Sequence, residues 1–500
     1  MSCLSETKIL AYRQCPKRLW LEIHRPALRE DSAATEASFR EGHEVGEIAR
    51  QIYDPKGKGE LIKCKETGID AAIARTKELL ALRNPIFKAG FATEDARAFA
   101  DVLVSARKKG KLGWRMIEVK SSTEIKPCHR DDVAIQFHIA KSSGVPLTSI
   151  SLAHIDNSWV YPGQKEYQGL LVEHDLTEEA EEMGAEVQEW IQEAHQVARR
   201  RTAPKITTGP QCKEPNECGF LGYCESLEPQ IKHPVTWLPN IRTKALKAAI
   251  TEQSLLHMKD VPDALLNEPQ LRVKKHTLAN RVYFNAAGAA ADLAGCSLPA
   301  YFLDFETINL AVPLWEGTHP YQQIPFQFSV HTLQRTGKLK QQSFLDLSGK
   351  NPSKSLAHAL ILACGTRGPV FVYNASFEKK CIRDLAKRFP RLKTSLLAIN
   401  ERIVDLYPIA KEHFYHPSQK GRWSLKRVLP AIASDLRYDE LEGVQDGGMA
   451  MEAYREAIDP NTTTARKKEI EQHLLAYCAL DTYAMVRIWQ KFAGRNDLEL

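Results

Sequence analysis

The sequence predicts a multidomain α/β protein, and three observations support this class. Its 500 residues with 43% hydrophobic content are enough for two or three separately cored domains. Beyond residue 299, the runs AYFLDFETI, PFQFSVHTL, QQSFLDL and PVFVYNA follow one another as β-rich segments, and helical patterns then dominate. Near residue 100, two strand-like runs flank a basic turn that contains glycine. Both halves of the chain therefore combine strands with helices.

The net charge and the cysteine content limit the kinds of partner and site that the chain is expected to have. A net charge of +6 permits a polyanionic partner without requiring one. The segment MSCLSETKILAYRQCPKRLW has no long apolar run and no small-residue cleavage site, and no stretch of about 18 apolar residues occurs. We therefore expect a cytoplasmic protein. Eleven cysteines without a secretory signal favour reduced thiols and a metal site over a disulfide framework.

Changes in sequence pattern divide the chain into three regions. Residues 175–201 read as one long polar helix, and the turn-rich, cysteine-rich segment after it indicates that a first domain, residues 1–225, ends there. Residues 226–298 contain short amphipathic pieces separated by proline and asparagine, which is typical of a helical connector. Residues 299–500 form the last predicted domain. No internal repeat or low-complexity tract is visible.

The first candidate site lies in the hairpin-like segment FADVLVSARKKGKLGWRMIEVKSS. Asp101 lies in its first run and Glu118 and Lys120 in its second, and a helical pattern that follows carries Gln136. Because side chains alternate along a strand, Glu118 and Lys120 share one face while Val119 packs on the other. Two carboxylates at one point can hold a divalent metal, and a neighbouring lysine can position water. A solvent-facing Glu-x-Lys on an edge strand is the common alternative.

This set of residues resembles the PD-(D/E)XK nucleases, and more closely their RecB-like branch, which includes CRISPR-associated exonucleases with an iron–sulfur cluster. The resemblance covers the first predicted domain. It implies a restriction-endonuclease-like fold, catalytic roles for Asp101, Glu118, Lys120 and Gln136, and metal ligands at Asp101, Glu118 and Val119.

Two positions depart from the pattern of that family. Its metal-binding histidine comes at the end of a glycine-rich helix, and in the matching segment FREGHEVGEIAR His43 lies at another offset, with Gly46 at the expected place. The tyrosine that often follows the glutamine by one helical turn is replaced by Ala140. We therefore do not assign His43 as a ligand.

Cysteines cluster near the end of the first predicted domain. The segment CKEPNECGFLGYC places Cys212, Cys218 and Cys224 at two equal spacings in a flexible loop, which suggests a metal ion or cluster. Cys15, in YRQCPKRLW, is the best remaining candidate for a fourth ligand. The iron–sulfur RecB-like exonucleases hold a [4Fe–4S] cluster with one early and three late cysteines, and the resemblance implies this cofactor here. A structural zinc site with four thiolates and a set of unligated cysteines are the alternatives. The other cysteines, which include Cys64, Cys296 and Cys478, read as buried small hydrophobes.

The second candidate site begins at FLDFET in the last predicted domain. Strand alternation places Asp304 and Glu306 on one face of an apolar strand, where two unpaired carboxylates would be costly without a cation. Further along, FVYNASFEKK carries Glu378 at the start of a helix. In LLAYCALDTYAMV, Tyr477 and Asp481 are four residues apart and share a helix face. Each of these patterns alone is also typical of ordinary solvated positions.

The order of these motifs resembles the DEDD exonucleases of RNase H-like, DnaQ-type fold, in the subtype whose last motif is Tyr-x3-Asp. The resemblance implies that Asp304, Glu306, Glu378 and Asp481 hold two Mg²⁺ or Mn²⁺ ions and that Tyr477 orients the attacking water. Glu378 replaces the usual aspartate of the second motif.

Several residues around this second site have secondary expected roles. Asp384 is a possible substitute for Glu378 further along the same helix, and Asp405 resembles an aspartate that supports the site from behind. Trp315 and Tyr321 could stack on a terminal base, although core packing explains them equally well. One segment contains four basic residues, Lys420, Arg422, Lys426 and Arg427. It either binds the phosphates of a nucleic-acid strand or is a solvated loop.

Together the two halves resemble an uncharacterised group of bacterial proteins that fuse an iron–sulfur RecB-like nuclease to a DEDD-type exonuclease. The resulting hypothesis is a metal-dependent, DNA-binding nuclease with two active sites, acting on single-stranded DNA ends in DNA repair or defence. The family resemblances imply opposite polarities, 5′ to 3′ for the first site and 3′ to 5′ for the second. A nucleic-acid end-binding or scaffold protein with decayed sites, and an RNA exonuclease, are the alternatives.

Overall fold

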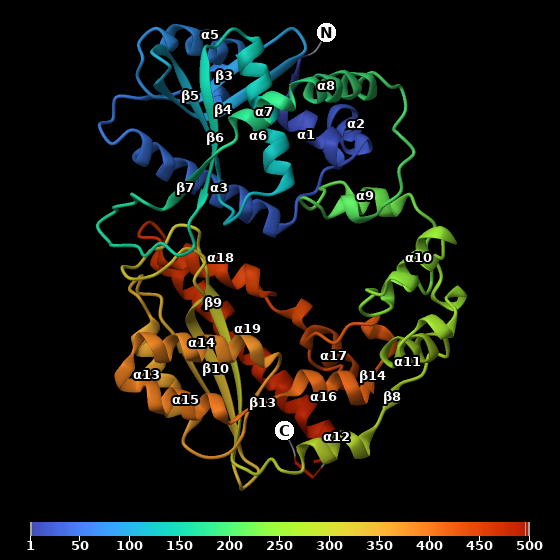
Figure 1. Ribbon diagram of the computed structural model, residues 1–500. Coiled ribbons are helices and arrows are strands. Elements are labelled where there is room, and N and C mark those ends of the chain that lie inside the picture. Colours follow the sequence, from blue (N-terminus) through green and yellow to red (C-terminus); the bar gives the residue numbers. More distant parts are fainter. Residues whose placement is uncertain (1–2, 496, 499–500) are drawn as a thin grey trace. The chain divides into compact units, whose positions relative to one another are not determined.

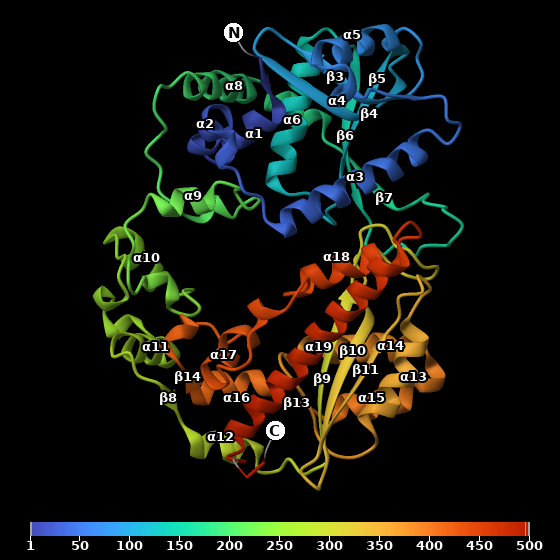
Figure 2. The ribbon, with the colours of Figure 1, turned by 180° about the vertical axis from the view of Figure 1, so that it is seen from behind.

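The computed structural model describes residues 3–495 and 497–498 of the chain. The chain divides into two compact units (Figures 1 and 2). Unit 1 comprises Met1–Pro229 together with Asn309–Gln322, and unit 2 comprises Gln230–Ile308 together with Gln323–Leu500. Both units combine a mixed sheet with helices, so the predicted α/β multidomain class is confirmed at this level.

Unit 1 is built on a mixed sheet that has seven strands within the described residues, in the order β2-β3-β4-β5-β6-β7, with β1 paired to β4. The central strands β3, β4 and β5 are antiparallel neighbours, whereas β5 and β6 are parallel. The strands are β1 Leu4–Ser5, β2 Glu60–Leu61, β3 Ile86–Ala92, β4 Ala96–Lys108, β5 Lys111–Lys120, β6 Leu147–Ile155 and β7 Leu171–Asp175.

Helices cover both faces of this sheet. The helices are α1 Glu6–Gln14, α2 Pro16–His24, α3 Ala33–Tyr53, α4 Cys64–Thr67, α5 Ile69–Leu80, α6 Pro127–Ser142, α7 Thr177–Glu182, α8 Gly184–Ala198 and α9 Leu221–Ser226. Strand alternation sends Met116 of β5 into the core shared with α6 and α8. It sends Ile117 and Val119 into a second core, shared with Val45 and Ile48 of α3. Glu118 therefore faces α6.

Unit 2 is built on a sheet of five strands within the described residues, in the order β11-β10-β9-β12-β13, and a small ladder joins β14 to β8. β9 is antiparallel to β10 and parallel to β12, which places it at the centre of the sheet. The strands are β8 Tyr283–Phe284, β9 Ala300–Ile308, β10 Ile324–Leu333, β11 Leu339–Leu345, β12 Val370–Val372, β13 Ile403–Asp405 and β14 Phe414–Tyr415.

Two hydrophobic cores flank the unit 2 sheet. One forms with helices α13 to α15, where Leu303 packs, and the other with α16 and α19, where Phe302 packs. The helices are α10 Lys244–Glu252, α11 Glu268–Leu278, α12 Ala286–Leu293, α13 Ser353–Cys364, α14 Ala375–Arg388, α15 Lys393–Glu401, α16 Leu406–His413, α17 Leu425–Ile432, α18 Gly447–Ile458 and α19 Thr464–Phe492.

Three segments refine the expected organisation. The long helix predicted at 175–201 is interrupted at Met183, so that α7 and α8 are separate helices. Gly184 directly follows this break, and glycine has a low helix propensity. The region 226–298 consists of short helices whose apolar residues share a core with Phe302 of unit 2. Asn309–Gln322, which interrupts the β9–β10 hairpin, packs its Ala311 and Val312 into the α3 core of unit 1.

Within the described residues, no helix combines the length and apolar character that a membrane span requires.

Candidate active sites and cysteine cluster

The first site forms where β4, β5 and α6 meet. β4 and β5 are antiparallel with Val102 opposite Ile117, so Asp101 and Glu118 are cross-strand neighbours. The backbone N–H of Val119 donates to Asp101 Oδ2 at 2.9 Å. The structure therefore brings together the two carboxylates and the intervening backbone that the sequence had singled out.

Lys120 joins this site to helix α6. Its Nζ donates to Glu118 Oε1 at 2.6 Å and to Asp132 Oδ2 at 2.5 Å. Gln136, one turn further along α6, donates from Nε2 to Asp132 Oδ1 at 3.1 Å. Asp132 is a site residue that the sequence reasoning missed. Its position four residues before Gln136 on one helix face was the available signal.

A second lysine, Lys88 of β3, was also missed. Its Nζ contacts Asp101 Oδ1, and its backbone has a φ of 56°, where the ladder between β3 and β4 skips the pair Lys88–Asp101. A non-glycine residue in the left-handed region is uncommon and clusters at functional sites. The lone lysine within the apolar run IFKAGFA was the signal in the sequence.

The acids of the first site carry displaced pKa values. Burial and the charge of Asp101 raise the pKa of Glu118 to about 8. Burial also acts to raise the pKa of Asp101, but the charges of Lys88 and Lys120 outweigh it and the pKa lies below its usual range. Among the described residues, Glu118 Oε2 and Gln136 Oε1 are buried and have no hydrogen-bond partner. Buried acceptors in this state are costly, and a bound cation or water would satisfy them.

Glu6 adds a further carboxylate that the sequence reasoning missed. Its Oε2 accepts a hydrogen bond from the Phe99 backbone N–H at 2.8 Å, next to Asp101 on β4. Burial and the charges of Asp132 and Glu118 raise its pKa well above the usual value. In the sequence, Glu6 follows the N-cap Ser5 and looks like an ordinary acid in the first turn of a helix.

The positions at which the sequence departs from the family pattern lie on α3 and α6. His43 lies on α3 with an exposed side chain. At Gly46 an added Cβ would meet no atom within 4 Å. Ala140 is fully buried in the unit 1 core. The structure thus does not bring His43 into the group of site residues.

The four cysteines singled out by their spacing line one pocket. Cys15 lies at the start of α2, while Cys212, Cys218 and Cys224 come from the loop and short helix near residue 220. Burial raises the pKa of Cys218 and Cys224, and the charges of Cys212 and Cys15 act in the same direction on both thiols. Residues about 200 positions apart in the sequence therefore converge on one site.

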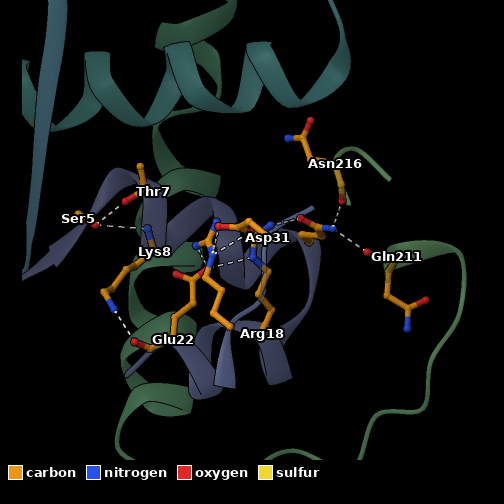
Figure 3. A network of polar contacts seen from close by, with 10 residues as sticks. Ser5, Thr7, Lys8, Arg18, Glu22, Asp31, Gln211 and Asn216 are labelled. Atoms are coloured by element: carbon orange, nitrogen blue, oxygen red, sulfur yellow. Dashed lines mark hydrogen bonds and ion pairs between the residues drawn. The ribbon is translucent and has the colours of Figure 1, made fainter. Parts of the chain in front are cut away.

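Polar contacts hold the N-terminal helices against the cysteine loop (Figure 3). Gln14, beside Cys15, donates from Nε2 to the carbonyl oxygens of Gln211 at 2.7 Å and Asn216 at 2.8 Å. Arg18 contacts Gln14 Oε1 and so anchors this glutamine from the other side. Arg18 itself donates to Glu22 Oε1 at 2.9 Å. The loop that carries three thiols is thus bound to the end of α1, directly before the fourth thiol, Cys15.

The second site lies on β9, the central strand of unit 2. One carboxylate oxygen each of Asp304 and Glu306 and the Sγ of Cys478 lie within 4.8 Å of one another, a grouping that could hold a metal ion. Cys478, on α19, is buried as expected, yet its sulfur faces these acids and approaches the Asp304 carbonyl oxygen at 3.8 Å. The expectation that Cys478 is only a small hydrophobe was therefore incomplete. Cys64 and Cys296 are half-buried.

Asp481 joins this group from α19, together with two tyrosines. The Tyr438 hydroxyl donates to Asp481 Oδ1 at 2.5 Å, and a hydrogen bond from Tyr477 also reaches this carboxyl. Burial raises the pKa of Asp481 to about 6, although both phenols and the charge of Lys426 oppose the shift. Tyr438 was missed because it lies in a loop about 40 residues before Asp481, with no local pattern around it.

Glu378 completes the set from the first turn of α14. It is 3% exposed, and its Oε2 has no hydrogen-bond partner among the described residues. Burial raises its pKa to about 8. Asp384, the possible substitute, pairs instead with Lys380 at 3.0 Å. The geometry therefore favours Glu378 over Asp384.

Asp405 supports the turn that precedes Glu378. Its carboxylate accepts backbone hydrogen bonds from Asn374, Ala375 and Tyr407, each at 2.9 Å. Asn374 has a φ of 82°, so these contacts hold a strained turn directly before α14. The supporting position expected for Asp405 agrees with this geometry.

Asp304 shows how closely the four acids converge. Burial and the charges of Asp481, Glu306 and Glu378 raise its pKa well above the usual value. Burial and Asp481 also raise the pKa of Glu306, against the opposing charge of Lys426. Mutual repulsion of this kind is relieved by a bound cation.

The aromatic and basic residues near this site separate into different environments. Tyr321 packs in the α3 core of unit 1, and its hydroxyl contacts Glu41 and the Ser121 carbonyl oxygen. This favours packing over base stacking for Tyr321, and Trp315 belongs to the same unit 1 segment. Of the four basic residues, Lys420, Arg422 and Arg427 are exposed. Lys426 is half-buried, and its charge acts on the acids.

Comparison with known families gives one match. A family model described as a domain of unknown function, DUF2779, matches residues 301–424, which carry β9 to β14 with Asp304, Glu306 and Glu378. The match ends before Tyr477 and Asp481. No curated protein matches the sequence.

Proposed function

We propose that the chain is a metal-dependent nuclease with two active sites that hydrolyses phosphodiester bonds at single-stranded DNA ends. Unit 1 would be a RecB-like PD-(D/E)XK domain, and unit 2 an RNase H-like exonuclease domain of the Tyr-x3-Asp type. The observation that carries the proposal is the convergence of Asp304, Glu306, Glu378 and Asp481 in unit 2, where burial raises the pKa of each carboxyl and the charges of the other three add to the shift at Asp304.

The donor set in unit 2 fits divalent cations. Hard cations such as Mg²⁺ and Mn²⁺ prefer carboxylate oxygens, and the Glu378 Oε2 atom is a buried acceptor without a partner among the described residues. Asp304, Glu306, Glu378 and Asp481 would hold the ions, since the charges of the other three act on Asp304. When bound, two such ions activate water and stabilise the departing oxygen. Tyr477, which hydrogen-bonds Asp481, would orient the water.

The oxygen atoms in unit 1 also fit a divalent cation, with two carboxylates in place of four. Asp101 and Glu118 would hold a cation together with the Val119 backbone, and the buried Glu118 Oε2 atom has no partner in the described part of the chain. Lys120, which bridges Glu118 and Asp132, would position the attacking water.

The four thiols of the cysteine pocket would hold an iron–sulfur cluster, the cofactor that the family resemblance implies. A single zinc ion with four thiolate ligands is the alternative.

The nuclease proposal is tested with linear single-stranded DNA blocked at its 5′ or its 3′ end, in the presence of Mg²⁺ or Mn²⁺. Asp304→Asn should reduce degradation from the 3′ end by more than about a hundredfold, because even outer-shell changes at metal sites cost about 10–100-fold. Lys120→Met should reduce degradation from the 5′ end by a similar factor. Matched controls are Asp384→Asn and Lys141→Met, which remove charges paired on the helix surface.

Three outcomes separate the alternatives. Full activity in both site variants would refute catalysis at these sites, and strand binding without any cleavage would favour an end-binding or scaffold protein. Preferential degradation of an RNA strand of the same sequence would replace DNA as the substrate. The controls should match the wild-type protein in every assay.

The cluster proposal is tested separately by iron and zinc analysis of protein purified without oxygen. The wild-type protein should contain iron and show broad visible absorption. Cys218→Ser should lose the iron, whereas Cys64→Ser, which removes a half-buried thiol of the same unit, should retain it. Stoichiometric zinc without iron would overturn the cluster assignment.

A further inference from the structure

Lys88 interrupts an otherwise apolar strand of the first site. Its φ of 56° lies in the left-handed region, where residues other than glycine are strained. The two-residue period of β3 breaks at this position, because Ile86 and Ala89 pack into the same core. The ladder between β3 and β4 skips the pair Lys88–Asp101. The irregular backbone therefore places a lysine next to a candidate metal ligand.

The Lys88 ammonium group lies where a cation would approach the acids. Its Nζ contacts Asp101 Oδ1, while Asp101 Oδ2 accepts the Val119 backbone N–H at 2.9 Å, so both oxygens of this carboxylate are engaged. Burial acts to lower the pKa of this ammonium group, but the charges of Asp101, Glu118 and Glu6 outweigh it and raise the pKa. One ammonium group thus interacts with three carboxylates, two of which would hold the cation.

The two lysines of this site differ in their freedom to move. The Lys120 side chain is 22% exposed and is bound to two carboxylates, those of Glu118 and Asp132. The Lys88 side chain contacts Asp101 and is 48% exposed. A half-exposed lysine can move its ammonium group into water on its flexible stem, so no buried charge is left unpaired. Lys88 is therefore the lysine that can leave its carboxylate.

A divalent cation at Asp101 would compete with this ammonium group. Mg²⁺ binds carboxylate oxygens at about 2.1 Å, so a cation on Asp101 Oδ1 would lie next to the Lys88 nitrogen. Positive charges at such short range repel each other strongly. Glu118 Oε2, which is buried and has no hydrogen-bond partner among the described residues, offers the cation a second oxygen. Cation binding and the Lys88–Asp101 contact therefore oppose each other.

We propose that Lys88 is a built-in counter-ion of the first site, which neutralises Asp101 in the metal-free protein and is displaced when a divalent cation binds. This inference rests on the proposed metal site of unit 1 and extends it, since it names the group that sets how tightly the cation is held. Lys88 is then a positioning residue that acts through Asp101. The contact that stabilises the metal-free site also weakens its affinity for the cation, because that contact has to break.

The experiment measures Mn²⁺ binding by calorimetry in full-length protein that carries Asp304→Asn and Glu378→Gln, which weaken the second site. In this protein, Lys88→Met should bind Mn²⁺ about tenfold more tightly, the effect of one charge-assisted contact that no longer has to break. Lys88→Arg keeps the charge and should retain the original affinity. The matched control is Lys141→Met, since Lys141 pairs with Glu181 at 3.0 Å on the surface of the same unit.

A merely structural role of Lys88 would have the opposite effect, because a loosened site binds the cation more weakly. Unchanged or weaker Mn²⁺ binding by Lys88→Met, or an equal gain in Lys141→Met, would overturn the inference. If Lys88→Met does not fold, Lys88→Gly, which suits a φ of 56°, replaces it with the same expectation. Tighter Mn²⁺ binding by Lys88→Met, when the wild-type protein degrades no strand, would refute the nuclease proposal and leave the counter-ion assignment standing.

Discussion

The two acidic sites differ in how their charges are compensated. In unit 1, Lys120 lies between Glu118 and Asp132, and Lys88 contacts Asp101, so each of these carboxylates has a lysine partner. In unit 2, the charges that act on Asp304 come from Asp481, Glu306 and Glu378, and among the described residues the one positive charge that opposes this group is Lys426, which acts on Glu306 and Asp481. The comparison teaches that clustered carboxylates can be held in a fold either by ion pairs with lysines or against repulsion from one another.

This difference has a consequence for stability without metal. Removing one member of a buried carboxylate–lysine pair leaves an uncompensated charge and destabilises the fold. A carboxylate crowded by other carboxylates destabilises the fold until a cation binds. The same chemical change should therefore act with opposite sign in the two units.

The largest effect is expected for Lys120→Met in unit 1. The substitution leaves Glu118 and Asp132 facing each other without a cation. Breaking a buried ion pair costs 3–5 kcal/mol, and we expect about 3 kcal/mol because the Lys120 side chain remains 22% exposed. Urea unfolding measures the loss, and Lys141→Met, whose ion pair is on the surface, should change stability by less than about 0.5 kcal/mol. Equal effects of the two variants would contradict the assigned role of Lys120.

A smaller effect is expected from pH in the metal-free protein. Glu378 has a pKa of about 8 in the folded state, above its ordinary value of 4.5, so the folded state binds the extra proton between these values. Its contribution to stability is full below pH 4.5 and is lost as pH rises through 8. We expect on the order of 2 kcal/mol between pH 5.5 and pH 8.

Thermal unfolding in a chelator, monitored across this pH range, measures the effect. Glu378→Gln should weaken the dependence, and part of it should remain because the pKa of Glu118 is also raised to about 8. Asp384→Asn, on the same helix as Glu378, should leave the dependence unchanged. A pH dependence that is identical in Glu378→Gln and the wild-type protein would show that Glu378 is not the group responsible.

The smallest effect, about 1 kcal/mol, tests the sign of the comparison directly. In the absence of metal, Asp304→Asn should stabilise unit 2, because it removes repulsion from three acids. Asp101→Asn should destabilise unit 1, because the charges of Lys88 and Lys120 favour the ionised Asp101 carboxylate and hold its pKa below the usual range. Adding Mn²⁺ should raise the melting temperature of the wild-type protein more than that of Asp304→Asn. Destabilisation by both variants in chelator would remove the distinction between the two sites.

Strand alternation made several site residues predictable from the sequence alone. Glu118 and Lys120 share a face of β5, and Asp304 and Glu306 share a face of β9, because the two-residue period of a strand is a local property. The three late cysteines are close in the sequence, so their convergence also follows from local spacing. The α/β class depended on the same local patterns.

Other residues could not be predicted because their roles depend on contacts between distant segments. Glu6 reaches β4 across about 90 residues, and Tyr438 reaches Asp481 across about 40. Each looks ordinary in its own segment, one as an acid in a first helical turn and the other as a loop tyrosine. The segment Asn309–Gln322 is similar, since its apolar residues gave no indication that they belong to the core of unit 1.

The sequence by itself determined the two acidic strands, the cysteine loop and the helix that carries Tyr477 and Asp481, since hydrophobic period and ligand spacing act over a few residues. Only the tertiary structure decided how these acids are compensated. Lys88, Asp132, Lys426 and Tyr438 reach their carboxylates from other elements, and electrostatic energy depends on distance in space and on burial rather than on position along the chain.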